Sequence, residues 1–423
     1  MEPPDRARES ASHDGLVAVF DDMDRSDPSP ATHAESHAEF LNRVHTPYWA
    51  SVRELIERWY SHLPNDALAD VRARLRSHDD RQFHAAFWEL YLHETLTRSG
   101  CLVICHPEVA GTSRRPDFFV AGTDGEFYLE ARVASEADDK ITADRRRNRV
   151  YDSLNRLDSP NFFLWVDVEG EGASDLATRG LRRQLEQWLG LLDPDEIHHQ
   201  LVESEDIRSI TPFEWKDTDW YLVFRPWPKA PESRGTDEIR PLGVFGPGEA
   251  YMIDDVTPLK KALANKGSAY GVLDRPYVVA VRTSSMSADE FDILNALYGS
   301  LQVQFSRGPG GETVTREVRA PDGYWFAGTH WQHRHVSGVL IARSLQPWTV
   351  STDVPTIWQH PEPELPIAPP PMWRRSIVRD GALEYVDATV KPHELLGLPE
   401  LWPEGDPFDP YGSNRSDEEH ERK

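Results

Sequence analysis

The apolar pattern of residues 81–98 constrains the fold more than any other feature of the sequence. At helical spacing it forms two stripes instead of one, made of Phe83, Phe87, Leu90 and Tyr91 on one side and Ala85, Trp88, Leu92 and Leu96 on the other. A helix that is apolar on two sides is buried between other elements. Gly100 follows as a residue that commonly ends a helix.

Three short strand patterns follow this helix, at 101–105, 117–120 and 127–133. The last two are joined by the Gly-Thr-Asp-Gly sequence at 122–125, which favours a tight turn. A helical pattern over 145–157 and an apolar, β-rich run over 161–168 come next. The sequence therefore predicts an α/β core in the order helix, three strands, helix, strand.

Composition divides the remaining sequence. Residues 1–45 and 401–423 are acidic and lack sustained periodicity, so we expect both to be mostly disordered, with one short amphipathic piece near residues 16–20. Residues 46–170 make up the predicted core with its N-terminal helices. Residues 171–400 alternate further helical and strand patterns, and they form either a second α/β domain or an extension of the first sheet.

The overall composition narrows the class of protein. The chain has 423 residues, of which 39% are hydrophobic and 28% charged, as is typical of a globular protein. No apolar run is long enough for a membrane helix, and the N-terminus has no secretory pattern. The two cysteines lie in one predicted strand, too far apart to pair. We therefore expect a cytoplasmic protein without a membrane partner.

Acidic residues occur where neighbouring strands would bring them together. Because side chains alternate along a strand, Glu130 shares one face with Tyr128 and Arg132, and Asp117 opens the adjacent strand. Two neighbouring carboxylates repel each other unless a cation lies between them, and hard oxygen ligands suit Mg²⁺ or Mn²⁺. A third carboxylate, Glu89, lies on an apolar row of the buried helix, with Glu94 on the other row as its rival.

This pattern resembles the PD-(D/E)xK, or restriction-endonuclease-like, nuclease superfamily. The residues that match its motif are Pro116-Asp117 and Glu130-Ala131-Arg132. In the preceding helix, the spacing of Glu89, Leu96 and Gly100 resembles that of its resolvase-like and Mrr-like members. The resemblance covers about residues 81–168 and implies a mixed-sheet αβββαβ core flanked by helices. It also implies metal-dependent phosphodiester hydrolysis on DNA, with Asp117 and Glu130 as metal ligands and Glu89 as a third, more distant acid.

Arg132 departs from this family, which usually has lysine at that position. Arginine stays protonated and cannot act as a base, although its planar fork of donors can hold a phosphate. Lys140 could take the role of the lysine. The basic helix that follows would border the site in this fold, and we expect phosphate or nucleic-acid contacts from Arg115, Arg145, Arg146 and Arg149.

Two functions follow from these residues. The first is a Mg²⁺- or Mn²⁺-dependent DNA nuclease in which Arg132 stabilises the phosphate. The second is a degenerate nuclease-fold module for binding or assembly, because the net charge of −25 repels nucleic acid. Its partner would be a second copy or another protein at the C-terminal half. A lysine that reaches Asp117 and Glu130 would favour the enzyme, whereas a dry ion pair with Arg132 or Arg115 would favour the module.

The same residues also have purely structural interpretations. Asp117 and Glu130 could be a strand cap and a surface carboxylate paired with an arginine, and Glu89 could be a buried acid paired with an arginine and no metal. The arginines of 145–149 could form a solvated helix face that balances nearby aspartates.

Overall fold

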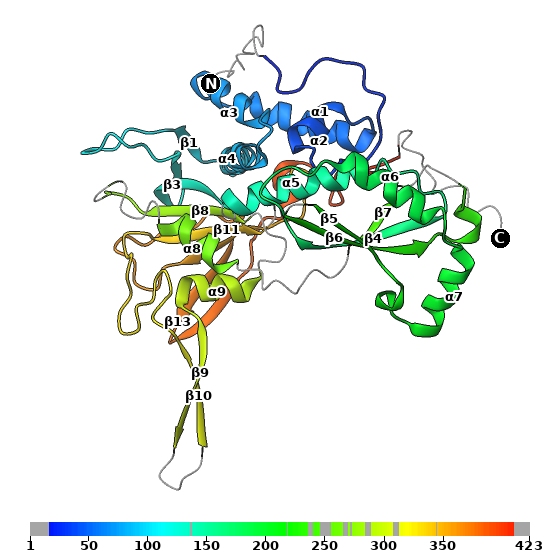
Figure 1. Cartoon of the computed structure of the whole chain (residues 1–423). Helices are drawn as coiled ribbons and strands as arrows, with labels where there is room; N and C mark the ends of the chain where they lie inside the picture. The colour runs from blue at the N-terminus through cyan, green and yellow to red at the C-terminus, as the bar shows by residue number, and fades with distance from the viewer. Residues whose placement is uncertain are drawn as a thin grey trace, which may run out of the picture. The chain divides into compact units, whose positions relative to one another are not determined.

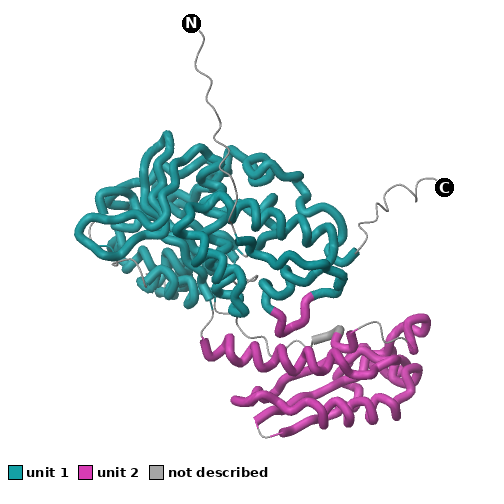
Figure 2. The backbone as a smooth tube through the Cα atoms, turned by 90° about the horizontal axis from the view of Figure 1, so that it is seen from above, with its two compact units in different colours: residues 1–30, 36–135, 255–423 teal, residues 31–35, 136–254 magenta. Residues whose placement is uncertain are grey.

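The computed structural model describes residues 17–135, 138–217, 219–235, 240–245, 255–264, 270, 273–283, 289–307, 313–343 and 345–409. The chain forms two compact units (Figure 2). Unit 1 contains residues 1–30, 36–135 and 255–423, and unit 2 contains residues 31–35 and 136–254. Residues 136–254, the main part of unit 2, are therefore inserted into the sequence of unit 1, and this division differs from the expected boundary between 170 and 171.

Unit 1 is built on a mixed sheet of eight strands. In spatial order the strands are β1 (Leu102–Cys105), β2 (Phe118–Gly122), β3 (Gly125–Ala134), β8 (Tyr277–Thr283), β11 (Gly338–Arg343), β12 (Thr356–Gln359), β13 (Arg374–Arg379) and β14 (Ala382–Val386). Strands β1, β2 and β3 are antiparallel neighbours, and β3, β8 and β11 run parallel to one another. The strands β8, β11, β12, β13 and β14 therefore extend the sheet that begins with β1, β2 and β3.

Helices cover both faces of this sheet (Figure 1). One face packs against helices from the N-terminal part of the chain and one short C-terminal helix: α1 (His37–Arg43), α2 (Pro47–Tyr60), α3 (Asn65–Leu75), α4 (Asp80–Arg98) and α10 (Pro392–Leu396). The other face packs against α8 (Val256–Ala264) and α9 (Glu290–Tyr298). None of the helices in the described residues is long and apolar enough to cross a membrane.

Helix α4 confirms the prediction of a buried helix. Phe83, Trp88 and Leu92 are fully buried, and the Trp88 indole N–H donates to the carbonyl of Ala280 on β8 at 3.0 Å. The tight turn is confirmed as well, since Gly122 pairs with Gly125 across it. The local sequence patterns therefore predicted this helix and this turn correctly.

The expected position of the next strand was wrong. Strand β4 (Phe162–Gly170) was predicted to complete the sheet of β1, β2 and β3, but it belongs to a separate sheet in unit 2. The parallel neighbour of β3 is β8, and α8 is the helix that precedes it. The order helix, three strands, helix, strand is thus present in unit 1 as α4, β1, β2, β3, α8 and β8.

The N-terminal region is also more ordered than expected between residues 17 and 45. Val19 and Phe20 are buried, and their backbone N–H groups donate to the Glu57 carboxylate at 3.1 and 2.8 Å. These bonds anchor an acidic segment that has little periodicity of its own. Residues 1–16 and 410–423, also expected to be disordered, lie outside the described residues, whereas 401–409 are described.

A two-stranded hairpin extends from the rest of unit 1 (Figure 1). It consists of β9 (Leu301–Arg307) and β10 (Thr313–Arg319), which are antiparallel. Leu301, Val303 and Phe305 alternate along β9, so they lie on one face of the hairpin, and Phe305 is 73% exposed. The hairpin therefore presents an apolar row to solvent.

Unit 2 has its own four-stranded sheet, in the order β5 (Phe213–Asp217), β6 (Trp220–Pro228), β4 and β7 (Leu242–Phe245). Its helices are α5 (Asp138–Leu154), α6 (Thr178–Leu189) and α7 (Pro194–Ser204). A separate hydrophobic core joins them, with Leu164, Leu181, Leu185, Leu222 and Phe224 fully buried. Unit 2 therefore contains the elements of a small folded domain.

Candidate functional site

Asp117 and Glu130 are neighbours on adjacent antiparallel strands. Phe118 pairs with Leu129, which places the residue before Phe118 beside the residue after Leu129. The backbone N–H of Ala131 donates to the Asp117 carboxylate at 2.7 Å. The structure therefore brings together the two acids that the sequence singled out.

Glu130 is held by donors of the chain itself. Its side chain is only 2% exposed, and its carboxylate forms an ion pair with the Arg132 guanidinium from the same face of β3. The hydroxyl of Tyr270 donates to the other carboxylate oxygen at 2.5 Å. Burial, followed by the hydrogen bond to Glu130, raises the pKa of Tyr270 above its ordinary value, so its hydroxyl remains a donor. The Glu130 carboxylate thus has two partners, the Arg132 guanidinium and the Tyr270 hydroxyl.

Asp117 lies in an unfavourable environment for a charge. Burial is the largest cause, followed by the charges of Glu130 and Glu89, and together they raise the pKa of Asp117 from 3.8 to about 7. The Ala131 N–H and the Arg132 guanidinium act in the opposite direction without cancelling this effect. Near neutral pH, a fraction of the Asp117 carboxyl groups is therefore protonated.

Glu89 contributes to this acidic cluster from α4, but its carboxylate has its own partner. Both oxygens accept from the Arg74 guanidinium, at 2.7 and 2.6 Å. Glu94, the rival residue, is bound by Arg98 and by the imidazole of His62. Glu89 is thus the third acid of the cluster, and Arg74 pairs with it.

Asp117, Glu130 and Glu89 carry the oxygen ligands that a divalent cation prefers, and side chains of the protein contact two of these three carboxylates. Arg132 and Tyr270 hold the two oxygens of Glu130, and Arg74 holds both oxygens of Glu89. Within the described residues, no group of three histidine, cysteine, aspartate or glutamate side chains forms a metal-binding arrangement. As folded, the carboxylate oxygens of Glu130 and Glu89 therefore already accept hydrogen bonds from the chain itself.

The predicted phosphate-binding arginines do not all belong to one unit. Arg115 lies in unit 1, where its guanidinium pairs with Glu108 at 2.7 Å. Arg145, Arg146 and Arg149 lie on α5 of unit 2, where Arg149 pairs with Asp175 at 2.7 Å. Lys140 also lies on α5. We expected the basic helix α5 to border Asp117 and Glu130. It packs into the core of unit 2, whereas Asp117 and Glu130 belong to unit 1.

The sequence did not reveal Tyr270. It stands between segments that lie outside the described residues, and no periodic pattern places it on a helix or strand. Arg74 was missed for a related reason, because its contact with Glu89 joins two different helices. Neither contact has a local signature that sequence reasoning can use.

No protein-family model matches this chain, and neither does any curated protein or solved structure. The interpretation of the cluster therefore depends on its own geometry.

Proposed function

We propose that the nuclease-like core of this chain serves as a binding or assembly module and does not hydrolyse phosphodiesters. The ion pair between Glu130 and Arg132 carries this proposal. Arginine occupies the position at which the nuclease superfamily that the sequence resembles usually has lysine. A guanidinium cannot accept a proton from water. The structure adds that this guanidinium contacts the buried Glu130 carboxylate. Arg132 thus stabilises the Glu130 carboxylate of the folded protein, at the position where catalysis would require a lysine.

The other acids support the same interpretation. Asp117 caps the backbone N–H of Ala131, and Glu89 forms a two-bond ion pair with Arg74. Breaking a buried pair by moving one partner away leaves an uncompensated charge. Rearrangement of the cluster around a metal would therefore break several of these contacts at once.

The β9–β10 hairpin favours a protein as the partner. A two-stranded hairpin is marginally stable in water by itself. Contact between the apolar row of Leu301, Val303 and Phe305 and another protein surface would remove that row from water. The chain's charge of −25 opposes nucleic acid as the partner, since phosphates would be repelled.

A metal-dependent phosphodiester hydrolase is the second candidate, and one observation favours it. The pKa of Asp117 is raised partly by Glu130 and Glu89, so three carboxylates share one region of negative potential. A divalent cation would relieve that repulsion if Arg132 and Tyr270 moved aside. Lewis-acid activation of water is the chemistry that such an ion supplies when bound.

Cleavage assays decide between the two candidates. Single-stranded, double-stranded and branched DNA are incubated with Mg²⁺, Mn²⁺ or EDTA and the wild type, Asp117→Asn or Glu130→Gln. Glu126→Gln is the matched control, because Glu126 lies on the same strand but is exposed and pairs with Arg275. We expect no metal-dependent cleavage and no heat of Mn²⁺ binding. Cleavage that is lost in Asp117→Asn and Glu130→Gln but kept in Glu126→Gln would refute the module and establish the hydrolase.

The assembly side of the proposal has a separate test. Sedimentation velocity over a range of concentrations compares the wild type with Phe305→Ser, which replaces the most exposed member of the apolar row. Self-association that the substitution weakens would identify a second copy as the partner. A monomer at every concentration would exclude self-assembly and leave a different protein as the partner to be sought by direct binding.

A further inference from the structure

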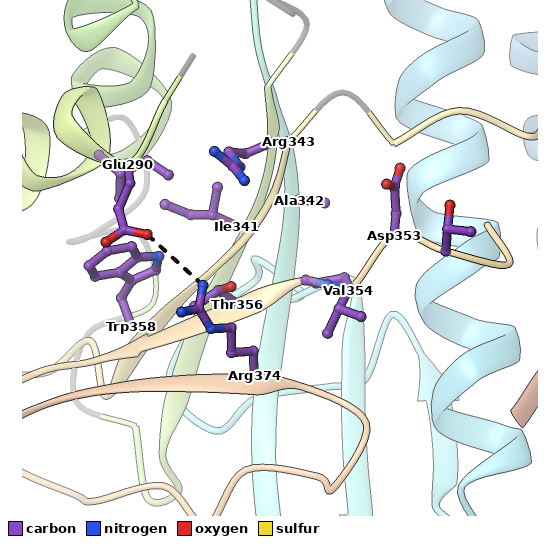
Figure 3. A pocket seen from close by; sticks show the side chains of 12 residues that line it. Glu290, Ile341, Ala342, Arg343, Asp353, Val354, Thr356, Trp358 and Arg374 are labelled. Carbon is purple, nitrogen blue, oxygen red and sulfur yellow. Dashed lines mark ion pairs between the residues drawn. The ribbon is translucent and has the colours of Figure 1, made fainter. Parts of the chain in front are cut away.

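A cavity of about 560 Å³ lies at the carboxyl end of β11 in unit 1, and none of its lining residues belongs to the acidic cluster (Figure 3). Its walls come from the start of α9, the end of β11, the segment 352–355, and the first residues of β12 and β13. Strands β8 and β11 are parallel, and crevices at the carboxyl ends of parallel strands are common ligand sites. The volume falls in the range of small-molecule sites.

Two buried polar atoms of the lining lack a hydrogen-bond partner, and both are donors. They are the indole Nε1 of Trp358, a residue only 2% exposed, and Nε of Arg374. The nearest carboxylates to Arg374 are at 3.9 Å, on Glu290, and at 3.6 Å, on Asp387, beyond hydrogen-bond distance. Figure 3 shows Arg374 pointing toward Glu290 and Trp358. An occupant that supplies acceptor oxygens would satisfy both donors.

The charged residues of the lining indicate which net charge of a ligand the cavity favours. Arg343 and Arg374 supply two cations, whereas Glu290 and Asp353 supply two carboxylates. Each carboxylate already accepts from a hydroxyl, Glu290 from Tyr385 and Asp353 from Thr349. Because the formal charges of the lining balance, a single negative charge is accommodated better than the two charges of a phosphate ester.

Part of the remaining lining is apolar, beside the hydroxyls of Thr352 and Thr356. Ile293, Ile341 and Val354 present hydrocarbon surface beside the two arginines. A ligand with a charged head and an apolar body would therefore find a matching surface for each part.

We infer that this cavity binds a small organic acid, with its carboxylate between Arg374, Trp358 and Arg343 and its hydrocarbon body against the isoleucines and Val354. The guanidinium of Arg374 is held in place by stacking on Tyr385, with its central carbon 4.2 Å from the ring centroid. A fixed planar fork of donors matches the two oxygens of a carboxylate. This site is independent of the function proposed for the acidic cluster.

Isothermal titration calorimetry on the full chain tests this inference with three probes that share one hydrocarbon body: hexanoate, hexyl phosphate and hexylamine. We expect hexanoate to bind best, and Arg374→Gln and Arg343→Gln each to weaken it about tenfold or more, as loss of a charged hydrogen bond predicts. Arg379→Gln is the matched control, since Arg379 lies at the far end of β13 and pairs with Glu384 at 3.5 Å. It should bind hexanoate as the wild type does.

Several results would overturn the inference. These are tighter binding of hexyl phosphate or hexylamine, no heat with hexanoate, or an affinity that neither arginine substitution changes. Arg343 is exposed, so Arg343→Gln keeps the test valid if Arg374→Gln fails to fold. Thermal unfolding of each variant checks that the fold is retained.

Discussion

Replacing Asp117 by asparagine should stabilise the protein above neutral pH. The substitution keeps an oxygen that can accept from the Ala131 N–H, while it removes the charge that burial, Glu130 and Glu89 disfavour. In the wild type this carboxyl has a pKa of about 7 in the folded state, against 3.8 for an ordinary aspartate. Between these two values the folded protein holds a proton that the unfolded chain has released.

The sign and size of the effect follow from that difference. Because the folded state binds more protons in this window, the free energy of unfolding falls as the pH rises, by about 1.4 kcal/mol per pH unit. Over the whole window the loss is about 4 kcal/mol, and between about pH 5.5 and about pH 8 it is about 2 kcal/mol. Asparagine does not titrate, so Asp117→Asn should escape this loss.

Urea unfolding of the wild type and Asp117→Asn at several pH values measures the difference directly. The relevant quantity is the change with pH in the difference between the two free energies of unfolding, because titrating groups that do not interact with Asp117 cancel in it. We expect the variant to gain about 2 kcal/mol relative to the wild type from about pH 5.5 to about pH 8. A difference that stays constant with pH would refute the reasoning.

The same pair of proteins bears on the two candidate functions. If a divalent cation binds the cluster, Mg²⁺ or Mn²⁺ should stabilise the wild type more than Asp117→Asn, because a ligand that binds only the folded state raises its stability. The proposed module predicts no such difference. A metal-dependent gain in the wild type alone would therefore support the hydrolase even without a cleavable substrate.

Three further substitutions test single contacts. Tyr270→Phe removes the hydroxyl that donates to Glu130, and urea unfolding should show a loss of about 1–3 kcal/mol; an unchanged stability would mean that water replaces the hydroxyl. Trp88→Phe removes the indole N–H that donates to the carbonyl of Ala280 and should lower stability by about 1 kcal/mol or more, and no loss would argue against that hydrogen bond. Leu185→Ala opens a cavity in the core of unit 2 and should cost about 2–5 kcal/mol. Calorimetry should show that loss in one of two transitions, and a shift of both would show that the units unfold together.

Local features of the fold could be predicted from the sequence, whereas its long-range pairings could not. The two apolar stripes of 81–98 and the glycine turn at 122–125 depend on residues close in sequence, and the structure contains both. The neighbour of β3 depends on a parallel pairing across the whole of unit 2. The apolar run at 161–168 was a good strand but gave no information about which sheet it would join.

The candidate site divides in the same way. The closeness of Asp117 and Glu130 followed from alternation along two adjacent strands, and the helical wheel correctly placed Glu89 on a largely buried row. The partners that decide the chemistry, Tyr270 and Arg74, come from elsewhere in the chain. Periodicity predicts which face a side chain occupies, but it does not predict which donor will meet that side chain.

The insertion of unit 2 has a consequence for how the protein is made. Tyr270 and Glu130 are separated by 140 residues in the sequence, and Trp88 and Ala280 by 192. On a ribosome, the edge of β3 that will pair with β8 emerges before the residues of unit 2, which have time to fold on their own core. Long-range parallel pairing is slow to form. A nascent chain that stops after residue 254 should therefore contain a folded unit 2 beside an unfinished, aggregation-prone sheet edge.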